Sequence, residues 1–297
     1  MTKFQIYDVF TKTTFSGNPL AIIPDAKITS DAQMLQIAKE FNLSETIFIS
    51  PKQDGYYTVR IFTPSAELAF AGHPTIGGAI AIARQEVGAE FTGIHKVIFI
   101  EKAGLVEINL QLGKQGHDYA EFIAPKIPQE IKIDLTATQA AEILGLTPAD
   151  IGFAGHNPSL FDCGTRFFAI PIQSRAALRQ IKLNATAAQK HIADQPHLAF
   201  YCYCAGEAEP VDFSTRMFSI GWGMAEDPAT GSAATSFAGV LAKYQDLTDG
   251  AHKFVLEQGV DMGRPSEIYL DISMAQGLLN QVKIGGYAAP FSHGNII

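Results

Sequence analysis

One stretch constrains the fold of this chain more than any other: residues 226–243, Glu-Asp-Pro-Ala-Thr-Gly-Ser-Ala-Ala-Thr-Ser-Phe-Ala-Gly-Val-Leu-Ala-Lys. Asp227 followed by Pro228 is typical of a helix N-cap and a first helical position. The residues after them are small or apolar on every side, and a helix without a polar face is normally buried. The stretch therefore predicts a central helix over about 231–244 with sheet curled around it.

The same design occurs earlier in the chain, which indicates an internal repeat. Residues 71–83, Ala-Gly-His-Pro-Thr-Ile-Gly-Gly-Ala-Ile-Ala-Ile-Ala, predict a second small, apolar helix over about 74–86. Upstream, Arg60-Ile-Phe-Thr63 matches Arg216-Met-Phe-Ser219, each roughly a dozen residues before its proline. The predicted fold class is α+β, with two pseudo-symmetric domains, each a mostly antiparallel curled sheet or barrel around a central buried helix.

The two prolines of residues 125–128 mark the expected linker, because they interrupt any regular element. The expected domains are thus residues 1–124 and 129–297. The apolar, glycine-containing tail from Tyr287 is expected to pair with a sheet, and it can pack on the first domain.

Composition narrows the class of partner. With 297 residues, 47% hydrophobic and 18% charged, the chain has the balance of a soluble globular protein. Its net charge of -8 argues against nucleic acid or an anionic membrane as partner. No apolar run reaches the roughly 18 residues that a membrane span needs. Three cysteines in a long chain suit a reducing cytoplasm, and Cys202-Tyr-Cys204 is better explained by core packing than by a metal.

Three titratable residues are the candidates for chemistry, and each also has a purely structural interpretation. Glu45 lies among apolar neighbours at the mouth of a strand, where desolvation favours a general acid or base, but local sequence alone favours a strand-edge Glu facing water. Asp227 and His73-Pro74 fit helix caps as well as a site. Because they occur at matched places in a repeat, we expect both helix starts to face a shared cleft.

Backbone N–H groups at a helix start suit an anion, and Thr230, Gly231 and Ser232 are the donors expected there, although capping explains them too.

The chain has no dinucleotide-binding glycine motif, no Walker loop and no nucleophile elbow. Its remaining histidines are scattered without metal-ligand spacing, so no metal is expected. Arg60 and Arg216 suit an anionic ligand or buried structural pairing.

Five motifs, spread in order over nearly the whole chain, resemble the phenazine biosynthesis PhzF-like family. They are Phe15-Ser-Gly-Asn-Pro-Leu20, Asn42-Leu-Ser-Glu-Thr46, Ala71-Gly-His-Pro-Thr75, Glu226-Asp-Pro-Ala-Thr-Gly-Ser-Ala233 and Gly263-Arg-Pro-Ser266. The resemblance implies the diaminopimelate epimerase-like fold, with the site between two pseudo-symmetric domains. It also implies a homodimer.

The resemblance further implies an enzyme that isomerises trans-2,3-dihydro-3-hydroxyanthranilic acid by moving a proton between ring carbons, without a cofactor. Glu45 would carry the proton, and His73 and Asp227 would hold the polar groups of the substrate. Ser44, Gly72, Thr230, Gly231 and Ser232 would line a small carboxylated ligand.

Two other functions stay open at this point. Epimerases of this fold that use two thiols place one at the start of each central helix, where this chain has Ala71 and Pro228, so a two-cysteine reaction is not expected. An epimerase or racemase with Glu45 and Asp227 as opposed bases is the second hypothesis. A non-catalytic protein that binds a small metabolite or a partner is the third.

Overall fold

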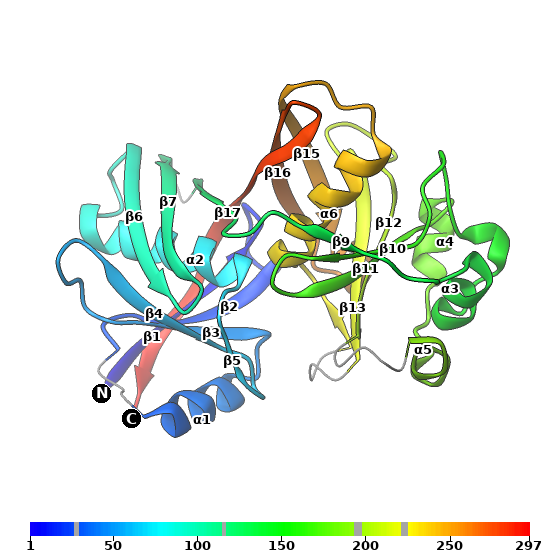
Figure 1. Ribbon diagram of the computed structural model, residues 1–297. Coiled ribbons are helices and arrows are strands. Elements are labelled where there is room, and N and C mark those ends of the chain that lie inside the picture. Colours follow the sequence, from blue (N-terminus) through cyan, green and yellow to red (C-terminus); the bar gives the residue numbers. More distant parts are fainter. Residues whose placement is uncertain (27–29, 115–116, 193–197, 221–224) are drawn as a thin grey trace. The chain divides into compact units, whose positions relative to one another are not determined.

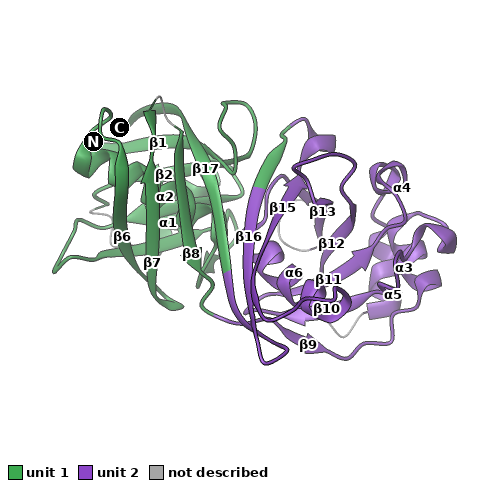
Figure 2. Ribbon diagram, turned by 90° about the horizontal axis from the view of Figure 1, so that it is seen from above, with its two compact units in different colours: residues 1–125, 264–267, 283–297 green, residues 126–263, 268–282 purple. Residues whose placement is uncertain are grey.

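The computed structural model of the chain describes residues 1–26, 30–114, 117–192, 198–220 and 225–297. It divides into two compact units, drawn in two colours in Figure 2. Unit 1 consists of Met1–Pro125, Arg264–Glu267 and Lys283–Ile297, and unit 2 of Lys126–Gly263 and Ile268–Val282. The C-terminal residues therefore belong with the N-terminal ones.

Unit 1 is a β-barrel. Within its described residues, eight strands pair into a closed ring in the order β1-β2-β3-β4-β6-β7-β8-β17, and β17 pairs back with β1. The bounds are β1 Thr2–Val9, β2 Asn18–Ile23, β3 Glu45–Ile49, β4 Tyr57–Phe62, β6 Gly93–Glu101, β7 Gly104–Leu112, β8 Asp118–Ile123 and β17 Leu278–Ile296. The short strand β5 (Glu67–Leu68) pairs with β4.

The helix α2 (Gly72–Val87) runs inside this barrel (Figure 1). Its residues from Gly72 to Ala83 are all buried, as a helix with apolar or small residues on every side requires. Gly77 shows how tightly the barrel closes: an added Cβ would lie 2.7 Å from side-chain atoms of Val9 and Leu20. A second helix, α1 (Asp31–Phe41), turns Met34 and Ala38 towards Phe48 and Phe62.

Unit 2 repeats the plan around helix α6 (Gly231–Tyr244). Phe237 of α6 packs edge-on against Tyr201, Tyr203 and Phe213. The strands are β9 Gln129–Ile131, β10 Ser159–Asp162, β11 Arg166–Pro171, β12 Leu198–Ala205, β13 Phe213–Ile220, β14 Glu226–Asp227, β15 Gly250–Gln258 and β16 Ser266–Ala275. Pairing follows β9-β10-β11-β12-β13, and both β14 and β15 pair with β13.

Three helices cover the other face of β11, β12 and β13: α3 (Ala137–Leu144), α4 (Arg175–Gln180) and α5 (Ala185–Ile192). Cys202 and Cys204 are buried in the apolar core beneath them, as their alternation along a strand predicts. Short 3₁₀ turns at Pro148–Asp150 and Val260–Met262 connect the elements.

The repeat seen in the sequence has a matching pair of ion pairs in the structure. Arg60 of β4 donates to both carboxylate oxygens of Glu67 in β5, at 2.7 Å each. Arg216 of β13 does the same to Glu226 in β14, at 2.7 and 2.8 Å. Each guanidinium also lies over the phenylalanine two residues on. Buried structural pairing therefore accounts for the two arginines.

One expectation about unit 2 was wrong. Asp227 does not cap the central helix, because it pairs in β14 with Met217 of β13. The N-cap is Thr230, and the helix begins at Gly231. The bidentate bond between Glu226 and Arg216 holds this segment extended, so Pro228 lies before the helix and not in its first turn.

Candidate active site

In unit 1, the start of β3 and the start of α2 bring a carboxylate and an imidazole together. Glu45 is the first residue of β3, and its side chain is largely but not fully buried. His73 is the second residue of α2 and is 3% exposed. His73 Nε2 lies 3.5 Å from Glu45 Oε2.

Asn18, the first residue of β2, fixes the tautomer of His73. Its amide Nδ2 lies 3.4 Å from His73 Nδ1. An amide nitrogen only donates, so Nδ1 is the acceptor and the proton of the neutral ring is on Nε2. That N–H is on the side of Glu45.

Burial keeps this imidazole uncharged. Desolvation lowers the pKa of His73 from 6.5 to about 3. At neutral pH the ring is therefore a neutral hydrogen-bond donor beside Glu45 and does not act as an imidazolium acid.

The two neighbours predicted to line a ligand lie on the same elements. Gly72 is the first residue of α2, is buried, and precedes His73 directly. The N-cap is Ala71, whose methyl side chain cannot accept a hydrogen bond from the first helical N–H groups. Ser44 precedes Glu45 at the entry to β3 and is partly exposed.

In unit 2, a hydrogen-bond network holds Asp227 and Thr230. Thr230 Oγ1 donates to Asp227 Oδ2 at 2.5 Å, and Asp227 is 5% exposed. Gln258, the last residue of β15, is fully buried and donates through Nε2 to the Asp227 carbonyl at 2.7 Å. Thr230 N donates in turn to Gln258 Oε1 at 3.2 Å. These bonds fix the side chain of Asp227 relative to the start of α6.

Gly231 and Ser232 form the first turn of α6. The N-cap hydroxyl of Thr230 makes no capping bond into the helix; it donates to Asp227 Oδ2 and accepts a bond from Gln258 Nε2. Cys163, far away in the sequence, lies with Sγ 3.4 Å from the Ser232 carbonyl. Burial raises the pKa of this thiol to about 11, so it stays protonated and serves as a hydrogen-bond donor.

Sequence reasoning missed Asn18 and Gln258. Asn18 stands inside the Phe15–Leu20 motif, so the motif contained it without revealing its role. Gln258 continues the buried face of β15 after Leu256, and this alternation was the only signal for it.

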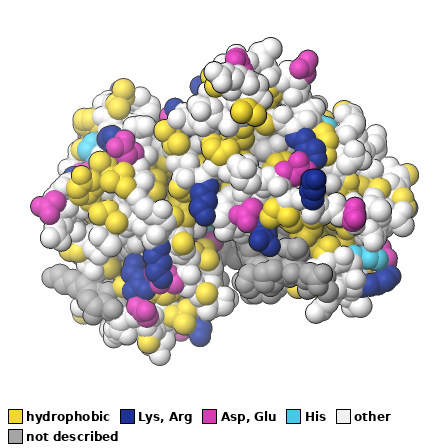
Figure 3. Space-filling model, in the orientation of Figure 1, with side chains coloured by type: hydrophobic (Ala, Val, Ile, Leu, Met, Phe, Trp, Pro, Cys, Tyr) yellow, Lys and Arg dark blue, Asp and Glu magenta, His cyan; other side chains and the backbone are white. Residues whose placement is uncertain are grey.

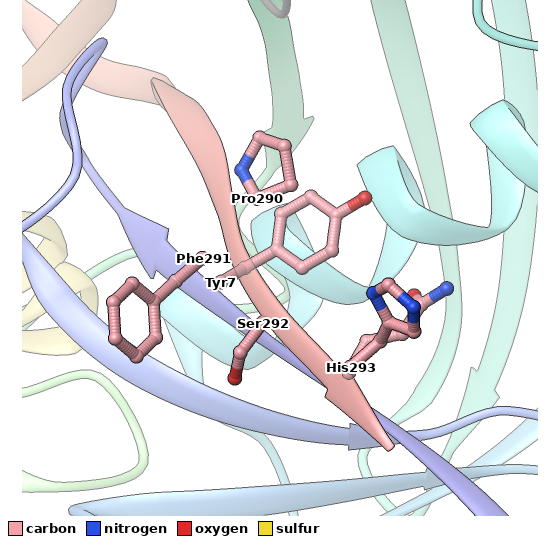
Figure 4. Close-up of a pocket in the computed structure, with 6 residues that line it drawn as sticks. Tyr7, Pro290, Phe291, Ser292 and His293 are labelled. Carbon is pink, nitrogen blue, oxygen red and sulfur yellow. The ribbon is translucent and has the colours of Figure 1, made fainter.

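The structure also has a hollow of about 400 Å³ on unit 1 that contains none of the predicted residues. It is lined by Gln5 and Tyr7 of β1 and by Pro290 to His293 of β17 (Figure 4).

On the face seen in Figure 3, Lys and Arg side chains lie interspersed with Asp and Glu over the described surface. Among the described residues, no helix is long and apolar enough to cross a membrane.

Comparison with known proteins agrees with this architecture. A sequence profile of the phenazine biosynthesis-like protein family matches residues 7–294. An uncharacterized isomerase of Mesorhizobium japonicum is 36% identical, over 99% of this chain and 98% of that protein. The trans-2,3-dihydro-3-hydroxyanthranilate isomerase of Pseudomonas aeruginosa is 33% identical, over 99% of each. The crystal structure of a PhzF-family protein of Bacillus anthracis superimposes with a TM-score of 0.89 at 22% identity, covering 100% of this chain and 99% of that one.

Two curled sheets, each around a buried helix, define an α+β protein of the diaminopimelate epimerase-like fold. The relatives that are named for an activity are isomerases, and the chain is an isomerase. It belongs to the phenazine biosynthesis-like (PhzF) family.

Proposed function

We propose that the chain isomerises a small carboxylated substrate by moving a proton between carbon atoms, with Glu45 as the acid/base and without a cofactor. The observation that carries this proposal is the geometry around His73: a buried, neutral imidazole whose Nε2–H is on the side of Glu45. The 33% identity to trans-2,3-dihydro-3-hydroxyanthranilate isomerase supports that compound as the first substrate to test.

In this mechanism, Glu45 Oε2 takes the proton from one carbon and returns it to another. Removing a proton from carbon leaves negative charge on the substrate, which fixed donors stabilise best. His73 contributes a neutral N–H donor, because burial lowers its pKa to about 3.

We propose that Asp227, together with Thr230, Gly231 and Ser232, binds the polar groups of the same substrate. The support is that Gln258 and Thr230 hold Asp227 in one orientation, and that the side chain of the N-cap, Thr230, makes no bond into the first turn of α6. The N–H groups of such a turn suit the substrate carboxylate. Ser44 and Gly72 would line the ligand beside Glu45 and His73.

The test is turnover of trans-2,3-dihydro-3-hydroxyanthranilate in D2O. Glu45→Gln keeps the shape of the side chain but removes its proton-carrying oxygen, and we expect a loss of 10²–10⁴-fold in kcat. Glu40→Gln, an exposed change in the nearby helix α1, is the matched control and should leave kcat unchanged. Asp227→Ala should raise KM more than it lowers kcat.

Other outcomes identify the alternatives. Inversion of a stereocentre with deuterium uptake, lost in both Glu45→Gln and Asp227→Asn, would replace this proposal by a two-base epimerase. Ligand binding without any exchange at carbon would replace it by a non-catalytic binding protein.

We also propose that the protein is cytoplasmic, as its three cysteines indicate, and that it is a homodimer, as expected from the family. Light scattering coupled to gel filtration tests this assembly, and a mass near the monomeric 32.1 kDa would contradict it.

A further inference from the structure

A second buried carboxyl group lies near the start of α2 and has no part in the mechanism above. Glu101 is the last residue of β6 and is 5% exposed. Its Oε1 lies 2.8 Å from Thr75 Oγ1, and its Oε2 has no hydrogen-bond partner among the described residues. Thr75 Oγ1 also lies 2.7 Å from the carbonyl oxygen of Ala71, the N-cap of α2.

Counting protons assigns the charge of Glu101. The Thr75 hydroxyl has one proton, and the Ala71 carbonyl can only accept. The 2.7 Å bond to Ala71 therefore uses the proton of Thr75. The equally short contact with Glu101 then needs a proton from the carboxyl side, which makes Glu101 a neutral carboxylic acid.

The other repeat has a neutral group at the equivalent position. Strand β6 pairs in parallel with β4 as β15 does with β13, and Glu101 and Gln258 each lie one residue beyond these paired segments. Gln258 bonds Thr230, the N-cap of α6, directly. Glu101 reaches Ala71, the N-cap of α2, through Thr75. An amide cannot ionise, so unit 2 shows that this position works with an uncharged side chain.

The titratable groups on the elements around Glu101 are engaged with one another. On β4, β6, β7 and α2, and at Lys102, the partnered groups are Arg60–Glu67, Lys102–Glu67, Lys96–Glu107, His95–Glu86, Tyr57–Glu86, Lys52–Glu86, Arg84–Asp118 and His73–Glu45. In the part of the chain that the structure describes, Glu101 has no ion-pair partner. Burial raises its pKa to about 8.

We propose that Glu101 is a positioning residue that holds the first turn of α2, and with it His73, only while its carboxyl group is protonated. Ionised Glu101 would draw the Thr75 proton away from Ala71 and leave a charge buried beneath this turn. The inference rests on the proposed function only for its effect on turnover.

The direct test uses NMR of the intact protein without substrate. It follows the protonation of the Glu101 carboxyl group and the Nε2–H signal of the His73 ring. In wild type, one Glu side-chain ¹³C carboxyl signal should titrate near pH 8 and be missing from Glu101→Gln. The His73 Nε2–H signal should shift or broaden over the same pH range in wild type. It should stay unchanged in Glu101→Gln, which retains a neutral donor to Thr75.

Two further variants separate positioning from general stability. Thr75→Val removes the hydroxyl and should give the high-pH His73 signal already at pH 7. Glu107→Gln removes an exposed carboxyl from the neighbouring strand β7 and should behave as wild type at every pH.

Turnover provides the second readout. Above pH 8 the wild-type kcat should fall about tenfold per pH unit, in proportion to the protonated fraction, and Glu101→Gln should lack this decline. A Glu101 carboxyl that titrates near its ordinary value, or a His73 signal with the same pH dependence in wild type and Glu101→Gln, would overturn the inference. Because the NMR measurements need no substrate, they decide it even where the proposed reaction fails.

Discussion

His73 illustrates how much of a site depends on distances that the sequence does not contain. The motif of His73 and its position at a helix start predicted a site residue. The motif of Glu45 and its position at the mouth of a strand did the same. The separation of 3.5 Å between the two side chains, and the tautomer set by Asn18, come from two strands and a helix closing on one another. Long-range packing decides such contacts, and residues 18, 45 and 73 lie too far apart in the chain for local patterns to predict them.

Burial of His73 also predicts a dependence of stability on pH. Its pKa in the folded state, about 3, lies below the ordinary 6.5, so the unfolded chain takes up a proton first as the pH falls. The stability that neutral His73 contributes is complete above pH 6.5 and is lost between pH 6.5 and 3. The loss should be about 1.4 kcal/mol per pH unit.

Urea unfolding of wild type and His73→Gln at pH 7.0, 5.5 and 4.5 measures this effect. Gln does not titrate, so wild type should lose stability relative to the variant at each step down in pH. A stability difference that is the same at all three pH values would contradict the assignment of His73 as a neutral buried ring.

At the scale of elements, two buried helices were predictable because their small, apolar residues on every side leave no face for water. The start of α6 was not, since Asp-Pro is typical of a helix start, whereas long-range pairing with β13 and the Arg216–Glu226 bond hold that segment extended. The repeat predicted the two arginines as a matched pair. Glu101 was missed although Val97, Phe99 and Glu101 alternate onto the buried face of β6, which is a readable signal.

Close packing of α6 gives a prediction in which helix propensity and packing oppose each other. Alanine favours a helix over glycine by about 1 kcal/mol. At Gly239, however, an added Cβ would lie 2.5 Å from the ring of Phe161, which is buried on β10. Gly239→Ala should therefore destabilise the protein by about 1–3 kcal/mol.

Chemical denaturation measures this change, with Gln36→Ala on the exposed face of α1 as the control. The control should be neutral or slightly stabilising. A Gly239→Ala variant at least as stable as wild type would show that Phe161 moves aside at no cost.

At the scale of the whole molecule, the last strand determines whether unit 1 can close. Strand β17 pairs with both β1 and β8, and without it the ring of unit 1 is open. Deleting residues 283–297 should therefore expose unit 1 to hydrogen exchange, including β1 and β8. The core of α3, α4 and α5 on β11–β13 uses only residues of unit 2 and should stay protected.

Hydrogen exchange with mass spectrometry tests this, and removal of the exposed Ile297 alone is the control. Retained protection of β1 after the larger deletion would show that β17 is dispensable for the barrel. The boundary between the units was only partly predictable from sequence. The prolines at 125 and 128 flank the point where unit 1 gives way to unit 2. The return of residues 264–267 and 283–297 to unit 1 depends on strand pairing at long range.

The closing strand has a consequence for how the protein is made. At about 5–20 residues per second, a ribosome needs roughly 15–60 s for a chain of this length, and the first strand emerges that long before its partner β17. Residues 126–263, which supply the core of unit 2, are made before β17. The unit whose first strands are translated earliest is thus the one completed last, and until β17 is made both β1 and β8 have an unpaired edge.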